Sequence, residues 1–135
     1  GQKSGKGFYI YDENRNKSPD PEVEALIRKF GEERQIRMRD DITKEEILER
    51  CLYPMVNEGF KILEEGMAIR ASDIDIVWTN GYGWPVYEGG PMFYGNIIGF
   101  DKILFWLKKA ELELGPEFKP SAYLEKVVTE EINIF

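Results

Sequence analysis

The chain has 135 residues, of which 42% are hydrophobic and 13% aromatic, and its formal net charge is −7. This composition suits one globular domain with a sizeable core, and the acidic excess argues against a nucleic-acid groove, because phosphate binding relies on Lys and Arg. The absence of histidine excludes Ser-His-Asp triads, Cys-His pairs and His-ligated metal sites within this chain. No apolar run approaches the roughly 20 residues that a membrane span requires.

The chain opens with a polar, glycine-rich segment, residues 1–7 (GQKSGKG). Its spacing is one residue short of a phosphate-binding loop, and Gly7 stands where that motif needs Ser or Thr. We therefore interpret it as a tail. Because the chain begins at Gly1 without an apolar signal core, we expect it to be a piece of a longer protein. The aromatic segment 8–11 is the one stretch expected to be extended, and the charged residues 12–18 are expected to form a loop.

A short helix is predicted next. Asp20 followed by Pro21 is a favourable N-cap and first-turn pair, because the carboxylate accepts free backbone N–H groups and proline lacks one. The apolar spacing continues to about Phe30, and Gly31 is expected to end the helix. The basic residues that follow are interrupted by apolar ones and predict a solvated connector rather than a binding site. They are Arg34, Arg37 and Arg39.

The strongest helix signal begins at Thr43, which forms a capping-box pattern with Glu46. Apolar residues keep a helical period to about residue 68, which predicts a central core helix. Pro54 interrupts it, because proline lacks an N–H and clashes with the carbonyl of Arg50. We expect a bend between these two residues.

The middle of this helix carries a thiol and a polar pair. Cys51, the single cysteine, is expected to be buried and inert among apolar neighbours. Asn57 and Glu58 stand beside Gly59, where a second helix is expected to approach closely and share their hydrogen bonds. A buried polar clamp is favoured over catalysis there.

Helical signals return in the C-terminal half. Ser72 is the expected N-cap of a shorter helix that stops in the glycines after residue 80. The run 81–95 (GYGWPVYEGGPMFYG) predicts an ordered turn packed against helices rather than a dinucleotide loop, because no strand leads into it. Met92–Ile98 is a possible helix start, and a helix is predicted from Phe100 to Leu114. Ser121 then caps the last helix. The predicted fold class is all-α, a helical domain around a long Pro-bent helix.

Paired acidic side chains are the remaining catalytic candidates, but helix termini and solvated faces explain them more simply. They are Asp73 with Asp75, Glu45 with Glu46 and Glu49, and Glu64 with Glu65.

Three segments together carry a family resemblance: GKGFYIYD at 5–12, ERCLYPMVNEGFKILEEGMA at 49–68 and GYGWPVYEGGPMFYGNIIGFD at 81–101. In combination they resemble the 3-hydroxyacyl-CoA dehydrogenase C-terminal domain family. The resemblance implies that residues 1–18 are the tail of a preceding helical copy. Residues 19–42 would then be a short helix and connector, and 43–135 a second helical dehydrogenase module.

The same resemblance implies a parent enzyme of fatty acid β-oxidation. That parent would hold a hydratase domain, a Rossmann domain that binds NAD and carries the acid-base His and Glu, and two helical copies. The implied partners of this chain are the preceding helical copy and the NAD-binding domain, with acyl-CoA as the parent's substrate. No cofactor is expected in the fragment itself. The implied localisation is peroxisomal, with the bacterial cytoplasm as the alternative.

Competent first copies of the family carry an Asn immediately before an Arg on the bent helix, whereas this chain has Glu49 before Arg50. The glycine turn is also longer than in first copies. The resemblance therefore implies a structural, packing role with no catalytic, cofactor-binding or metal residue. The expected structural and interface residues are Glu49, Arg50, Pro54, Asn57, Glu58, Gly83, Trp84, Pro85, Gly89, Gly90 and Pro91.

Two alternatives stay open. One is a stand-alone helical protein-interaction domain that uses its aromatic patch. The other is retained acyl-CoA binding through Lys108 and Lys109.

Overall fold

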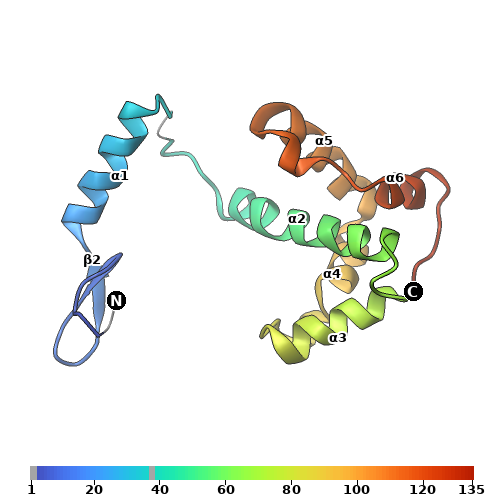
Figure 1. Ribbon diagram of the computed structural model, residues 1–135, viewed down its shortest axis with the longest axis horizontal. Helices are drawn as coiled ribbons and strands as arrows, with labels where there is room; N and C mark the ends of the chain where they lie inside the picture. The colour runs from blue at the N-terminus through green and yellow to red at the C-terminus, as the bar shows by residue number, and fades with distance from the viewer. Residues whose placement is uncertain (1–2, 37–38) are drawn as a thin grey trace. The chain divides into compact units, whose positions relative to one another are not determined.

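The computed structural model describes residues 3–36 and 39–135. The chain forms two compact units, Gly1–Ile42 and Thr43–Phe135, which are coloured blue to cyan and green to red in Figure 1. Among the described residues, no helix is long and apolar enough to cross a membrane.

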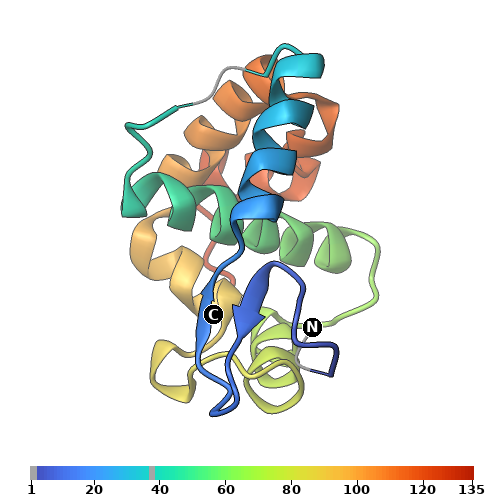
Figure 2. The same ribbon diagram turned by 90° about the vertical axis from the view of Figure 1, so that its left-hand side faces the viewer.

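The N-terminal unit begins with a hairpin of two short antiparallel strands, β1 (Tyr9–Tyr11) and β2 (Lys17–Pro19), drawn as blue arrows in Figure 2. The extended segment was predicted, but the expectation of a loop up to residue 18 was wrong for β2. The cause is the turn: Asp12 accepts hydrogen bonds from the backbone and side-chain nitrogens of Asn16, and Arg15 adopts a φ of 64°. These contacts bring the charged segment back beside β1.

Helix α1 (Pro21–Glu33) follows, with the buried Asp20 as its N-cap accepting from the backbone N–H of Glu22. The predicted stop at Gly31 was wrong, because this glycine lies inside the helix. Gln35 closes the helix instead: it adopts a φ of 56°, and the N–H of Ile36 donates to the carbonyl of Gly31. This is the hydrogen-bond pattern of a left-handed helix terminus. Of the predicted connector, Arg37 lies outside the described residues.

The C-terminal unit is built on α2 (Lys44–Glu64). Its N-cap is Thr43, as predicted, with the hydroxyl accepting from the backbone N–H of Glu46 at 3.1 Å. The helix continues through Pro54 and ends four residues before the predicted boundary. Gly66, at a φ of 70°, ends it together with a bond from the N–H of Met67 to the carbonyl of Ile62.

The other helices of this unit are shorter. They are α3 (Ala71–Gly81), the 3₁₀ turn η1 (Val86–Glu88), α4 (Pro91–Ile98), α5 (Phe100–Leu114), the 3₁₀ turn η2 (Pro116–Phe118) and α6 (Ala122–Thr129). Helix α5 has the predicted bounds, and Ser121 caps α6 as predicted. The predicted N-cap Ser72 was wrong. Arg70 holds that place because its backbone N–H and guanidinium both bond Asp73.

Helix α2 runs between the other helices of the C-terminal unit, as Figure 1 shows. The ring of Phe60, which is fully buried, meets Phe100 of α5 edge-on with centroids 4.9 Å apart. Met92 of α4 is also fully buried and lies so close to Gly59 that a methyl group there would overlap it. The prediction of an all-α fold class is confirmed, apart from the small hairpin.

Replacing Phe60 with alanine tests this core. Deleting a buried aromatic ring removes transfer free energy and leaves a cavity, so we expect Phe60→Ala to lower the free energy of unfolding by about 3–5 kcal/mol. The matched control is Phe105→Ala on α5, whose side chain is 75% exposed and whose loss should cost less than about 0.5 kcal/mol. Urea denaturation of the two variants measures both values, and equal losses would contradict the packing described here.

Candidate functional site

One buried polar group in the C-terminal unit is the carboxylate of Asp75, on the inner side of α3. Its two oxygens accept hydrogen bonds from the backbone N–H groups of Met92 at 2.7 Å and Phe93 at 3.1 Å. These are free donors at the start of α4, so Asp75 caps a helix other than its own. The two acidic residues of this helix were both predicted to lie at helix ends or on solvated faces. Asp73 does, because it pairs with Arg70 near the surface, whereas Asp75 is buried.

The sequence around the start of α4 makes room for this carboxylate. Gly90 adopts a φ of 101°, and a Cβ there would overlap the backbone and side chain of Asp75. Pro91 occupies the first helical position, where a missing N–H costs nothing. Gly90 and Pro91, both predicted structural residues, thus work as one unit with Asp75, which the sequence did not reveal as their partner.

Burial raises the pKa of the Asp75 carboxyl, and the two backbone hydrogen bonds only partly offset this effect. Desolvation penalises the charged form, whereas N–H donors favour it. The carboxylate is a structural acceptor, because each of its oxygens bonds a backbone N–H at the start of α4.

A second buried clamp centres on Asn57 of α2, which is 2% exposed. Its amide nitrogen donates to the carbonyl of Lys119 at 2.9 Å, and its oxygen accepts from the N–H of Ser121 at 2.8 Å. The Ser121 hydroxyl donates to Glu64 at 2.8 Å. The predicted partner was a second helix, but Asn57 holds the loop that leads into α6.

The other half of the predicted polar pair does not join this clamp. Glu58 is exposed and pairs with Lys61 at 3.3 Å, so the expectation that it is buried was wrong. One helical step turns it 100° away from Asn57. Cys51 is also exposed, contrary to prediction, because the N-terminal part of α2 is not covered by the core: Leu48 is 52% exposed, and burial begins at Tyr53.

The glycine turn between α3 and α4 gathers aromatic rings. Trp84 contacts Trp78 and Tyr94 edge-on, with centroids 6.1 and 6.0 Å apart, while Tyr82 and Tyr87 are largely exposed. Among the described residues the indole nitrogen of Trp84 has no hydrogen-bond partner although it is buried. The predicted turn residues Gly83, Pro85 and Gly89 shape this segment: two adopt positive φ values, and Pro85 precedes η1.

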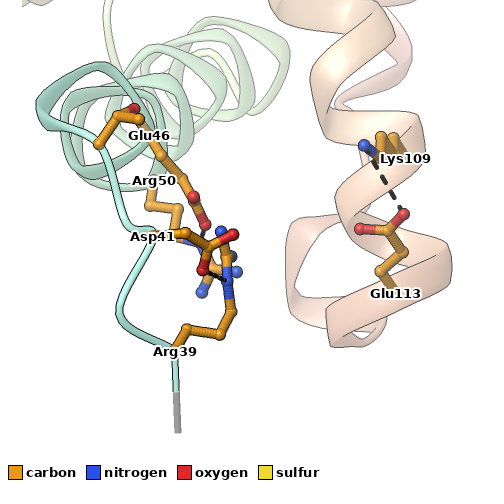
Figure 3. Close-up of polar contacts among 7 residues, drawn as sticks. Arg39, Asp41, Glu46, Arg50, Lys109 and Glu113 are labelled. Atoms are coloured by element: carbon orange, nitrogen blue, oxygen red, sulfur yellow. Dashed lines mark hydrogen bonds and ion pairs between the residues drawn. The ribbon is translucent and has the colours of Figure 1, made fainter. Parts of the chain in front are cut away.

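Glu49 and Arg50 lie on α2 before Pro54, which is inside the helix. The Arg50 guanidinium lies 3.3 Å from the Glu46 carboxylate, as Figure 3 shows. A hydrogen bond with the buried Tyr53 is the largest cause of the raised pKa of Lys102, and the negative charge of Glu49 adds a smaller effect in the same direction.

The lysines considered for acyl-CoA binding are also paired: Lys108 with Glu125 at 2.8 Å and Lys109 with Glu113 at 3.8 Å (Figure 3 shows the second pair). Within the described part of the chain, no group of three or more His, Cys, Asp or Glu side chains is placed to hold a metal ion. The arrangement is suited to holding helices together.

Substituting Asp75 tests the first clamp. Asp75→Ala would leave two backbone N–H groups without their acceptor. We therefore expect the free energy of unfolding to fall by about 1–3 kcal/mol per buried unpaired group, and by less where water replaces the acceptor. Glu58→Ala, which removes an exposed helix carboxylate, should change stability by less than about 0.5 kcal/mol. Thermal and urea unfolding compare the two, and a neutral Asp75→Ala would show that the clamp does not stabilise the unit.

Comparisons with known proteins identify relatives of this chain. The model of the family described as 3-hydroxyacyl-CoA dehydrogenase, C-terminal domain, matches residues 47–132. The peroxisomal bifunctional enzyme of Homo sapiens is 42% identical over 134 residues, covering 96% of this chain. The glyoxysomal fatty acid beta-oxidation multifunctional protein of Cucumis sativus is 37% identical over 127 residues, covering 92%. The chain spans 18% of the length of each.

A solved structure is also similar: the dehydrogenase part of multifunctional enzyme 1 from C. elegans. It is 35% identical, with a TM-score of 0.64, over 93% of this chain and 29% of that one.

Proposed function

The chain belongs to the 3-hydroxyacyl-CoA dehydrogenase C-terminal domain family, and on that basis we propose that it is a packing module of a multifunctional β-oxidation enzyme. In this proposal residues 43–135 are the second helical copy, residues 1–18 end the preceding copy, and residues 19–42 connect them. The module supports the active cleft that the NAD-binding domain and the first helical copy form, without entering the chemistry.

The observation that carries this proposal is the use made of buried polar side chains. In the C-terminal unit these are Asn57, Asp75 and Ser121, and each bonds the backbone at a junction between helices. A catalytic group needs a free atom that reaches the substrate. The polar side-chain atoms of these three residues hold α4 and α6 in place, which is what a support module requires.

The pair before Pro54 on α2 supports the same proposal. First copies in the family carry an Asn before an Arg there, and this chain carries Glu49 before Arg50. The Arg50 guanidinium is also engaged by Glu46.

The parent enzyme would supply what this chain does not. We propose that NAD binds the upstream Rossmann domain and that acyl-CoA binds the cleft between that domain and the first copy. Peroxisomal localisation is proposed from the human and other relatives, whose names describe peroxisomal or glyoxysomal enzymes. A stand-alone interaction domain remains the second candidate, favoured by the exposed Tyr82 and Tyr87.

Reconstitution tests the proposal. NAD-dependent oxidation of a 3-hydroxyacyl-CoA is measured for this chain alone, for the upstream Rossmann domain with the first copy, and for the two mixed. We expect no turnover by the chain alone and a higher rate on mixing, because docking rigidifies the cleft.

The matched control is the Phe60→Ala chain, whose damaged core should reduce the enhancement. Turnover by the chain alone would contradict the proposal and require a catalytic site within it. No enhancement on mixing would instead favour the stand-alone interaction domain.

A further inference from the structure

We propose that α3 and the turns at its two ends form the ridge on which the upstream part of the parent chain docks. This inference rests on the proposed function and names the surface through which the support would act. The ridge is defined by Met67, Ile69, Ile76, Val77, Tyr82 and Val86.

The first observation is the near absence of charge. Residues 74–87 (IDIVWTNGYGWPVY) contain one charged residue, Asp75, in a chain in which 32% of residues are charged. That carboxylate points inward to the start of α4. The solvent-facing side of α3 is therefore uncharged along this stretch, although surface helices ordinarily present charged residues to water.

The second observation is the exposure of large apolar side chains along the ridge. Met67 is 69% exposed, Ile69 91%, Val77 55% and Tyr82 72%. Apolar patches of contiguous residues on a protein surface mark interaction sites. Depletion of charge and enrichment of aromatic residues and Met are also the features of interface centres.

The third observation is shape, because α3 stands between two hollows. One, of about 540 Å³, is lined mostly by apolar residues such as Ile62, Met67 and Val77, with Asp73 as its charged member. The other, of about 390 Å³, lies on the opposite side of α3 and mixes apolar residues such as Ile76 and Val86 with the polar Ser72, Asp75 and Thr79. A helix flanked by two grooves can pack against a second helix, because the side chains of that helix fit into the grooves.

The ridge is also held in place before anything binds. Asp75 fixes α3 to the start of α4, and the Arg70–Asp73 ion pair at 2.8 Å closes the N-terminal end of the helix. A preformed surface loses less conformational entropy on docking. The charged pair then forms part of a polar rim beside an apolar centre.

The occupant we infer is an apolar helical surface of the same parent chain. The matched relatives extend far beyond this region, since the chain spans 18% of the human enzyme and 29% of the solved dehydrogenase part. A neighbour that is permanently tethered covers an uncharged surface without exposing it to water. A transient partner would favour a more polar surface.

Hydroxyl-radical footprinting tests the ridge by reading the accessibility of side chains. The 135-residue chain and the full-length parent enzyme are labelled under the same conditions. We expect Met67 and Tyr82 to lose labelling severalfold in the parent. Phe105 and Leu112 on α5 are 75% and 89% exposed but lie beside the charged Lys108 and Lys109 on that helix, so they should keep theirs. Equal labelling of the ridge in both proteins would overturn the inference.

A charged substitution provides the second arm. In the parent, Val77→Asp should restore labelling of Met67 and Tyr82, because docking would desolvate the new carboxylate. Leu112→Asp, at the exposed α5 position, should leave the protection intact. Unchanged thermal unfolding of the Val77→Asp chain by itself shows that the substitution does not unfold the module, and protection that survives Val77→Asp would overturn the inference.

The outcomes separate the ridge from the proposed function. If Val77→Asp removes the protection while the parent keeps full dehydrogenase activity, the ridge is supported and the supporting role is contradicted. An unprotected ridge with enhancement on mixing would overturn the ridge alone. Protection that disappears on dilution would indicate a second copy, and protection that needs added acyl-CoA would indicate a lipid site; either would also overturn it.

Discussion

The arrangement of the C-terminal unit depends on one carboxylate, that of Asp75, which satisfies two free N–H groups at the start of α4. Gly90 gives the carboxylate space, and Pro91 removes a donor that would otherwise need a partner. With α4 fixed in this way, Met92 reaches Gly59 in the middle of α2. The two hydrogen bonds of one carboxylate thus hold α4 where Met92 packs against the longest helix.

A second buried polar side chain on α2 holds a helix start in the same way: Asn57 bonds the backbone just before α6. Buried polar groups are engaged in joining helices, while apolar side chains remain exposed on α3. The buried polar atoms of this unit bond to the backbone at helix junctions, whereas the few polar groups of an active site converge on the pocket that holds the ligand. A rigid module with an apolar outer surface is suited to supporting a neighbouring domain.

Sequence reasoning succeeded where the signal is local. Thr43 and Ser121 revealed helix starts through their caps. It failed where a distant residue decides: Asp75 is 17 residues from Met92, so no spacing rule identifies it as the cap of α4. The prediction that Cys51 is buried was wrong for a related reason. Periodicity indicates which face of α2 is apolar but not how far along the helix the core extends.

The central claim is that the module supports a cleft without contributing chemistry, and the pair before Pro54 on α2 offers the most direct test. In the full-length parent enzyme, kcat for 3-hydroxyacyl-CoA oxidation is measured with Glu49 and Arg50 both replaced by alanine. The account predicts a kcat close to that of the unaltered enzyme. A fall of about a hundredfold or more, the scale expected for losing a catalytic group, in an enzyme whose module remains folded would contradict it.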